Sequence, residues 1–525
     1  MTAVRPAFFD DLILSRAAKL ALLIWGVVSL LAMLAYPFAY DQAAFFTGGE
    51  MIVRRSAIPY RDLIDTKPPL IFYLYGGAAA LFGHNQWGIR LVDVFWQATT
   101  AFVLFRLLSK QLSSEGIAFL ATFLYVWQYA ASGYWMTAQA ESFAILPTLL
   151  IAGLVLSIDD RKAFRSGLVS GVLLAIIFLL KFTLVLFFLG VIVYLVRRRF
   201  RSETIPYLLG SILSFALVFG GYLYHLHLVG GLENFVEAVR WVREYAALTP
   251  IFGAETIGME YHKLFPEFML RAFSISLTVL GGWGLVRVFS TAEAHSKHVY
   301  SLFSMCLLFA MLGVLYERKF FPYHYTRAFV FLTPFIAVGI AGLWHWLSKK
   351  RLSLGILVLG AVLLFFSPLM QTFTQTISWP IATVLGKDRE AIVQAKVKNY
   401  YAKEQRLVGE YLRERLLENE QIFFWGNGVG VYHFTDRLPQ SFALTVTPFI
   451  TPWTSISWKQ ELIRQLNETM PRYFIVEQDD AREYISGSEV DSYTHLQRWA
   501  ELRDFVTSHY SEEARIGHFI LYRRH

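Results

Sequence analysis

The chain has 525 residues, of which 55% are hydrophobic, 16% aromatic and only 17% charged, and its mean hydropathy is +0.43. Soluble domains average about 25% charged residues, so this composition excludes an ordinary soluble enzyme, a disordered chain and a fibrous protein. The net charge of +8 fits the Lys and Arg excess in the cytoplasmic loops of a membrane protein better than it fits nucleic-acid binding. The composition therefore predicts a polytopic α-helical membrane protein with no nucleic-acid partner.

Eleven apolar segments predict membrane-spanning helices, each of which needs about 20 residues to cross a bilayer. They are residues 19–38, 88–108, 116–134, 140–157, 166–180, 182–196, 205–227, 267–289, 299–316, 328–347 and 353–370. The short apolar stretch 69–83 is expected to be a helix on the membrane surface and not a span.

Clusters of Lys and Arg orient these spans, because such residues gather on the cytoplasmic side. Three clusters lie at residues 161–165, 197–201 and 349–351. All three face the cytoplasm if even numbers of spans separate them, as the eleven segments allow. This arrangement predicts that the N-terminus lies inside and that everything after residue 370 lies outside.

The apolar stretch 166–196 is interrupted by Lys181. Its length exceeds one span and falls short of two full spans. We expect a short helical hairpin with Lys181 at its outer tip. The alternative is one long tilted helix, which would reverse the orientation of everything downstream.

The composition becomes more polar after Pro380. Charged helical patterns such as residues 387–420 alternate there with short apolar runs that predict strands. These runs are Ile422–Trp425, Tyr473–Val476 and Phe519–Tyr522. The predicted organisation is a transmembrane domain over residues 1–380 and a soluble α/β domain outside the membrane over residues 381–525.

Ionisable residues collect on one side of the predicted bundle, and such groups at a membrane are candidates for function. The first outer loop, residues 39–87, carries Asp41 and Lys67. The others on that side include Arg90, Glu141, Lys181, Lys319, Tyr323, His324 and Tyr325. Cations there can hold the phosphate of a lipid-borne substrate, and a carboxylate can deprotonate a hydroxyl acceptor. The alternative for any single Lys or Arg is an ordinary anchor at the interface.

The first outer loop also carries a series of short motifs. Asp41 follows the first span, and the loop continues with Pro59-Tyr60-Arg61-Asp62, Asp65-Thr66-Lys67-Pro68-Pro69-Leu70, Leu81-Phe82-Gly83 and Arg90-Leu91. This order resembles the GT-C superfamily of membrane glycosyltransferases. It looks most like the glycosyltransferase family 39-like branch, which contains protein O-mannosyltransferases and the aminoarabinose transferase of lipid A. The resemblance is strongest over residues 36–110 and implies a GT-C-like fold.

The resemblance implies roles for individual residues. Asp41 matches the catalytic base, Lys67 the ligand of the donor phosphate, and Glu141 a second acidic residue that shapes the sugar or acceptor pocket. An extended, solvated Lys67 with no such role is the alternative.

Other residues are implied at the donor or acceptor pocket, namely Tyr60, Tyr323, His324 and Tyr325. The aminoarabinose branch has an Arg three residues after its aspartate, where this chain has Ala44. Another cation is therefore expected to assist the phosphate, with Arg90, Lys181 and Lys319 as candidates.

The predicted function is transfer of a sugar from a polyprenyl-phosphate donor to a hydroxyl of a lipid, glycan or protein. The reaction would invert the anomeric centre, on the outer face of a bacterial plasma membrane, without a cofactor or metal. The outer loop 228–266 is expected to cover the site. The alternatives are a transporter or flippase for a lipid-linked saccharide, whose sites lie near the bilayer midplane, and a membrane-anchored sugar receptor.

Overall fold

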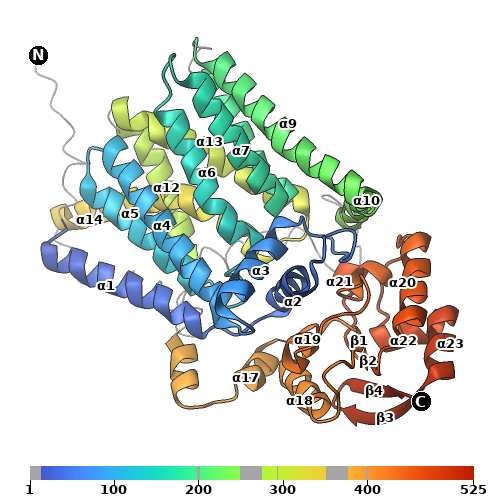
Figure 1. The fold of residues 1–525 in the computed structure, drawn as a ribbon. Helices are drawn as coiled ribbons and strands as arrows, with labels where there is room; N and C mark the ends of the chain where they lie inside the picture. The colour runs from blue at the N-terminus through green and yellow to red at the C-terminus, as the bar shows by residue number, and fades with distance from the viewer. Residues whose placement is uncertain (1–13, 198–201, 249–274, 292–293, 351–376, 398–399) are drawn as a thin grey trace, which may run out of the picture. The chain divides into compact units, whose positions relative to one another are not determined.

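The computed structural model describes residues 14–197, 202–248, 275–291, 294–350, 377–397 and 400–525 (Figure 1). Its contacts divide the chain into two compact units. The first unit comprises Met1–Tyr36, Arg90–Gly221 and Tyr261–Ile381, and the second comprises Pro37–Ile89, Tyr222–Glu260 and Ala382–His525.

The first unit is built from long apolar helices. They are α1 (Arg16–Ala32), α4 (Trp87–Gln111), α5 (Glu115–Ala131), α6 (Ala140–Leu156), α7 (Ala163–Leu180), α8 (Phe187–Arg197), α9 (Thr204–Val229), α12 (Ile275–Thr291), α13 (Ala294–Glu317) and α14 (Phe329–Lys350). The first residues of α4, up to Ile89, and the last residues of α9, from Tyr222, are part of the second unit. Short 3-10 turns, η1 (Met33–Ala35), η2 (Phe182–Leu186) and η3 (Pro322–Ala328), extend three of these helices. Helix α14 packs on α5 and α12, and α13 packs on α8.

Six helices among the described residues are long and apolar enough to cross a membrane, and four more are apolar but shorter. The predicted spans are helical over most of their described residues, whereas the segment 353–370 and residues 267–274 of the predicted span 267–289 lie outside the described residues. The fold is therefore that of a multi-pass membrane protein, and the total of eleven spans stays a prediction.

The helix break at Lys181 follows from its backbone. Helix α7 ends at Leu180, and Lys181 is extended, with φ −165° and ψ 123°. The chain then continues through η2 into α8. One uninterrupted tilted helix over residues 166–196 is therefore not what the structure has.

The second unit joins the first outer loop to the C-terminal residues. Its elements are α2 (Tyr40–Arg55), α3 (Leu70–Phe82), α10 (Leu232–Ala247), α17 (Arg389–Lys396), α18 (Ala402–Arg413), β1 (Ile422–Trp425), α19 (Gly430–Thr435), η4 (Thr447–Phe449), α20 (Ile456–Thr469), β2 (Tyr473–Glu477), α21 (Glu483–Ser486), α22 (Ser492–Arg498), α23 (Ala500–His509), β3 (Tyr510–Ile516) and β4 (Phe519–Arg524). The helix predicted over residues 69–83 is confirmed as α3.

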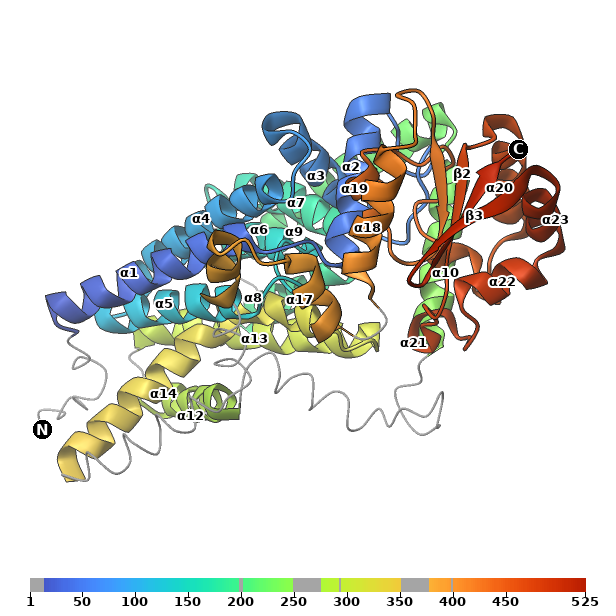
Figure 2. The same ribbon diagram turned by 90° about the horizontal axis from the view of Figure 1, so that it is seen from below.

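The C-terminal elements form an α/β layer structure. Within the described residues, the sheet has the order β1-β2-β4-β3, in which only the β1–β2 pair is parallel. Figure 2 shows α18 and α19 on one side of this sheet and α20, α22 and α23 on the other. Strands β1 and β2 are buried along their whole length because helices cover both faces. The predicted α/β fold of this part of the chain is confirmed.

Candidate active site

Helix α2 places Asp41 in its first turn, where the exposed amides of a helix N-terminus favour a carboxylate. The chain leaves α2 through a left-handed Ser56, with φ 54°, and forms a tight turn in which the amide of Tyr60 donates to the carbonyl of Leu63 at 2.7 Å. The amide of Ile64 then donates to the carbonyl of Phe442 at 2.7 Å. The loop is thus anchored on the C-terminal elements of its own unit before it reaches Lys67.

Asp41 and Lys67 form an ion pair, with Lys67 Nζ 2.9 Å from Asp41 Oδ1. The side chains are 14% and 25% exposed, so the pair is partly buried and still open to a ligand. Lys67 Nζ also lies 4.7 Å from the ring centroid of Phe45 on α2. The base and the phosphate ligand that the resemblance implies therefore lie side by side.

The backbone of Lys67 is fixed by two other residues of the loop. Its amide donates to Asp65 Oδ1 at 2.8 Å, and its carbonyl accepts from the Tyr60 hydroxyl at 2.8 Å. Tyr60 is itself buried, and its ring packs edge-on against Phe235 of α10. Tyr60 thus supports Lys67 through the main chain.

Asp65 lies beside this pair, and the pKa of its carboxyl is raised. Burial raises the pKa of its carboxyl to about 6, although the positive charge of Lys67 and the hydrogen bond from its amide act in the other direction. The negative charge of Asp41 also raises the pKa of Asp65. The charge of Asp65 therefore changes around pH 6.

A second group of charges lies in the first unit, where α6, α7, α13 and η3 meet. Lys181 Nζ lies 2.6 Å from Glu141 Oε1 and 2.8 Å from Glu317 Oε2. Arg327 reaches the same two carboxylates at 3.3 and 2.5 Å. Nδ1 of His324 is 2.8 Å from Glu317. We call Glu141, Lys181, Glu317, His324 and Arg327 the five-residue cluster.

The five-residue cluster brings together three of the predicted site residues, Glu141, Lys181 and His324. Tyr323 is next to it, since Lys181 Nζ lies 5.6 Å from the centroid of its ring. Glu317 was missing from the prediction, and Arg327 was assigned to the outer loop before the tenth span without a role in the site. Glu317 ends an apolar helix, where one acidic residue carries no local signal that it will meet Lys181.

Three donors of this cluster could hold a metal ion, since one ligand atom each of Glu141, Glu317 and His324 lies within 4.8 Å of the others. However, the two carboxylates are already paired with two cations, Lys181 and Arg327. The charges balance without a metal, and we interpret the group as an ion-pair network.

The remaining predicted residues are buried in the first unit. Both terminal nitrogens of the Arg90 guanidinium donate hydrogen bonds, to the carbonyl and hydroxyl of Thr137 and to the carbonyl of Tyr134. Lys319 is 1% exposed, and burial lowers the pKa of its ammonium to about 7. Tyr325 is fully buried.

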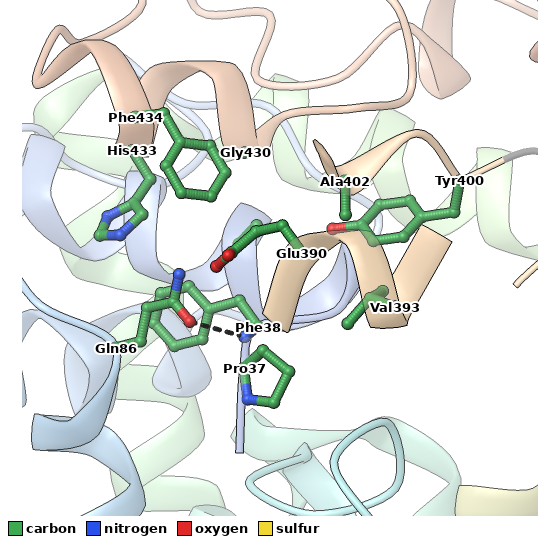
Figure 3. Close-up of a pocket in the computed structure, with 11 residues that line it drawn as sticks. Pro37, Phe38, Gln86, Glu390, Val393, Tyr400, Ala402, Gly430, His433 and Phe434 are labelled. Carbon is green, nitrogen blue, oxygen red and sulfur yellow. Dashed lines mark hydrogen bonds between the residues drawn. The ribbon is translucent and has the colours of Figure 1, made fainter. Parts of the chain in front are cut away.

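A small pocket of the second unit lies close to the start of α2. Glu390 points into it between Phe434 and Gln86, and Gln86 Oε1 accepts from the Phe38 amide at 3.1 Å (Figure 3). Its volume of about 10 Å³ is that of one water molecule. It is too small for a sugar, so it does not replace the Asp41–Lys67 pair as the candidate site.

The apolar helices and the α/β C-terminal part define a multi-pass membrane protein with a C-terminal α/β part. Comparisons with known proteins agree with this class. A family model described as dolichyl-phosphate-mannose-protein mannosyltransferase matches residues 66–223. No curated protein sequence matches the chain.

Two crystal structures of ArnT from Cupriavidus metallidurans have a similar fold. The form bound to undecaprenyl phosphate is 9% identical, with a TM-score of 0.57 over 97% of this chain and 98% of that one. The apo form is 10% identical, with a TM-score of 0.59 over 96% and 98%. The resemblance to GT-C glycosyltransferases and the fold class, both predicted from the sequence, are confirmed.

Proposed function

We propose that this protein transfers a sugar from a polyprenyl-phosphate donor to a hydroxyl acceptor. The observation that carries the proposal is the ion pair of Asp41 and Lys67, partly exposed and 2.9 Å apart, in a chain with the GT-C fold. The ArnT fold holds undecaprenyl phosphate in one of the two similar structures, which supports a lipid phosphate as the donor carrier here.

The Asp41–Lys67 pair supplies one group that binds the donor phosphate and one that acts as the base. Lys67 exchanges its carboxylate partner for the donor phosphate, and this exchange releases Asp41 to act as a base. Asp41 takes the proton of the acceptor hydroxyl, whose oxygen bonds to the anomeric carbon. The bond from that carbon to the phosphate oxygen breaks, and its electron pair leaves with polyprenyl phosphate. Attack from the side opposite the leaving group inverts the anomeric centre.

In the first unit, the ion pair of Glu141 and Lys181 within the five-residue cluster joins the start of α6 to the end of α7. Arg90 holds the backbone that precedes Glu141.

We place the reaction on the outer face of a bacterial plasma membrane. The support is the distribution of Lys and Arg, which puts the loop 39–87 and the residues after 370 on the side opposite the three basic clusters. The acceptor is a hydroxyl of a lipid, a glycan or a protein.

The proposal is tested with purified protein in lipid and a panel of polyprenyl-phosphate sugars, by measuring the release of polyprenyl phosphate. We expect one donor to be consumed, and we expect Asp41→Asn to lower the rate by about 100-fold or more, the size of a general-base contribution. Asp504→Asn is the matched control, because Asp504 is exposed and pairs only with Arg503 among its described neighbours.

Two outcomes would contradict the proposal. One is full turnover by Asp41→Asn, which would move the base elsewhere. The other is movement of a lipid-linked saccharide across the bilayer without chemical change, which would establish the transporter or flippase.

A further inference from the structure

Arg482 brings a positive charge from the C-terminal residues to the start of α2. It follows β2 and directly precedes α21, and its guanidinium lies 4.5 Å from the ring centroid of Tyr40. Tyr40 is the first residue of α2 and the neighbour of Asp41 in the chain. The C-terminal part of the second unit therefore reaches the residue next to the proposed base.

Tyr40 is held by the same part of the chain at its hydroxyl. That hydroxyl lies 3.3 Å from Thr447 Oγ1, and Thr447 in turn donates to Asn427 Oδ1 at 3.1 Å. Burial raises the pKa of the Tyr40 phenol, so it stays neutral. The positive charge of Arg482 and the negative charge of Asp65 both act on this phenol, which places Arg482 and the Asp65–Lys67 turn around one ring.

The N–H groups of the Arg482 guanidinium are available to a ligand. Within the part of the chain that the structure describes, it forms no ion pair and no side-chain hydrogen bond; it lies over the ring of Tyr40, and its charge also acts on the carboxyls of Glu477 and Asp480. The nearby acids Glu477 and Asp480 are occupied, since Glu477 accepts from the Gly428 amide at 2.6 Å and Asp480 from the Ser492 hydroxyl at 2.6 Å.

The charge balance at the Asp41–Lys67 pair requires another cation. The pair is neutral as a whole, and Asp65 adds negative charge when it ionises. An arriving phosphate brings at least one more negative charge. Two of the cations predicted to assist are engaged elsewhere, Arg90 with carbonyls of residues 134 and 137 and Lys181 with Glu141 and Glu317.

We propose that Arg482 binds the phosphate of the polyprenyl-phosphate donor together with Lys67, so that the C-terminal part of the chain completes the donor site. This inference rests on the proposed function. A guanidinium suits the role because its planar fork donates two parallel hydrogen bonds to a phosphate while its face stays stacked on Tyr40. The sequence carries no local signal for it, since Arg482 and Asp41 lie at opposite ends of the chain.

The test measures the affinity of the full-length protein in lipid nanodiscs for undecaprenyl phosphate. We expect Arg482→Gln to weaken binding about ten-fold, as for the loss of charge-assisted hydrogen bonds at a partly exposed site. Arg482→Lys, which keeps the charge and loses the fork, should fall between wild type and Arg482→Gln. Arg503→Gln is the matched control, because Arg503 is a half-buried arginine of the same part of the chain that pairs with Asp504 and donates to the carbonyl of Gln497, and this variant should bind as wild type does.

The contact between Arg482 and the ring of Tyr40 allows a second, independent test of the same binding. Tyr40→Phe keeps the stacking surface, whereas Tyr40→Leu removes it, so only Tyr40→Leu should approach the weakened affinity of Arg482→Gln. If Arg482→Gln does not fold, as judged by its melting temperature, the Arg482→Lys and Tyr40→Leu results decide.

A parallel Lys67→Ala arm separates the two proposals. Weaker binding by Lys67→Ala with wild-type affinity in Arg482→Gln, or in Arg482→Lys and Tyr40→Leu, would overturn this inference and leave the proposed function standing. Affinity unaffected by Lys67→Ala would count against the proposed function itself.

Discussion

At the scale of residues, the sequence predicted the two members of the central pair but not the full charge environment around them. Asp41 and Lys67 were identified by their motifs, and the turn at Tyr60 and Asp65 brings them together. Partners that come from distant parts of the chain, such as Arg482 beside Tyr40 and Glu317 beside Lys181, were not predicted. Single charged residues far apart in the sequence carry no spacing pattern that would connect them.

Asp65 should make donor binding depend on pH. Its pKa of about 6 means that raising the pH through 6 adds a negative charge beside Lys67, which weakens phosphate binding by an amount on the order of 1 kcal/mol. Asp65→Asn keeps an oxygen that can accept from the Lys67 amide and removes this ionisation. The affinity for undecaprenyl phosphate, measured from pH 5 to pH 8, should therefore fall more steeply in wild type than in Asp65→Asn. Parallel curves would mean that ionisation of Asp65 does not affect binding of the phosphate.

Because of Glu477, the free energy of unfolding should fall as the pH rises. Burial, and then the negative charge of Asp480, raise the pKa of the Glu477 carboxyl well above its ordinary value. Above the ordinary pKa near 4.5, the folded chain binds more protons than the unfolded chain, so the free energy of unfolding falls with pH until the raised pKa is passed.

Glu477→Gln removes this proton and keeps an acceptor for the amides of Asn427 and Gly428. Melting temperatures measured from pH 4.5 to pH 8 should show the variant gaining on wild type as the pH rises, by at most about 1.4 kcal/mol per pH unit. A difference that stays constant over this range would mean that Glu477 is ionised in the folded protein.

At the scale of elements, hydrophobic length predicted the helices of the first unit well, because a long apolar run can satisfy its backbone in a membrane only as a helix. Three elements of the second unit were missed. Helix α2 contains Gly48 and Gly49, residues of low helix propensity, and α10 was read as a loop. Strand β3 has the polar sequence Tyr510–Ile516 because it is an edge strand with an exposed face.

The contact between Gly49 of α2 and Gly76 of α3 explains why α2 contains a glycine despite its low helix propensity. A Cβ on Gly49 would lie 2.5 Å from the backbone nitrogen of Gly76 on α3, so the helices approach too closely for any side chain. We expect Gly49→Ala to cost about 1–3 kcal/mol, as for overpacking, and to reduce sugar transfer, because α2 carries Asp41 and α3 begins three residues after Lys67.

Gly77 is the control on the partner helix α3, next to Gly76, since a Cβ there meets nothing within 4 Å. Gly77→Ala should leave the melting temperature unchanged or slightly raised. Equal destabilisation by both substitutions would show that the contact with Gly76 does not matter.

At the scale of the whole molecule, the first outer loop forms a compact unit with the C-terminal residues. The prediction placed the loop within residues 1–380, and the boundary at 380 stays a prediction. Arg54 pairs with Asp436 at 2.7 Å, and Arg55 donates to the carbonyl of Pro439 at 2.5 Å. Such contacts between distant segments follow from the tertiary fold and leave no trace in local sequence patterns.

A chain that ends at Ile381 should therefore keep its membrane helices and lose the order of its first outer loop. Limited trypsin digestion in nanodiscs should cut at Arg54 and Arg55 about ten-fold faster than in the full chain, since the loss of these contacts favours local opening. Equal cleavage rates would show that the loop folds without the C-terminal residues.

In the proposed reaction, Asp41 and Lys67 act on a polyprenyl-phosphate donor. The most direct measurement is an experimental structure of Asp41→Asn with a polyprenyl-phosphate sugar bound, in which turnover is blocked. We predict that the phosphate lies within hydrogen-bond distance of Lys67 Nζ and that the side chain at position 41 faces the anomeric carbon across the space for an acceptor hydroxyl. A phosphate bound away from Lys67, near the middle of the membrane, would contradict the account.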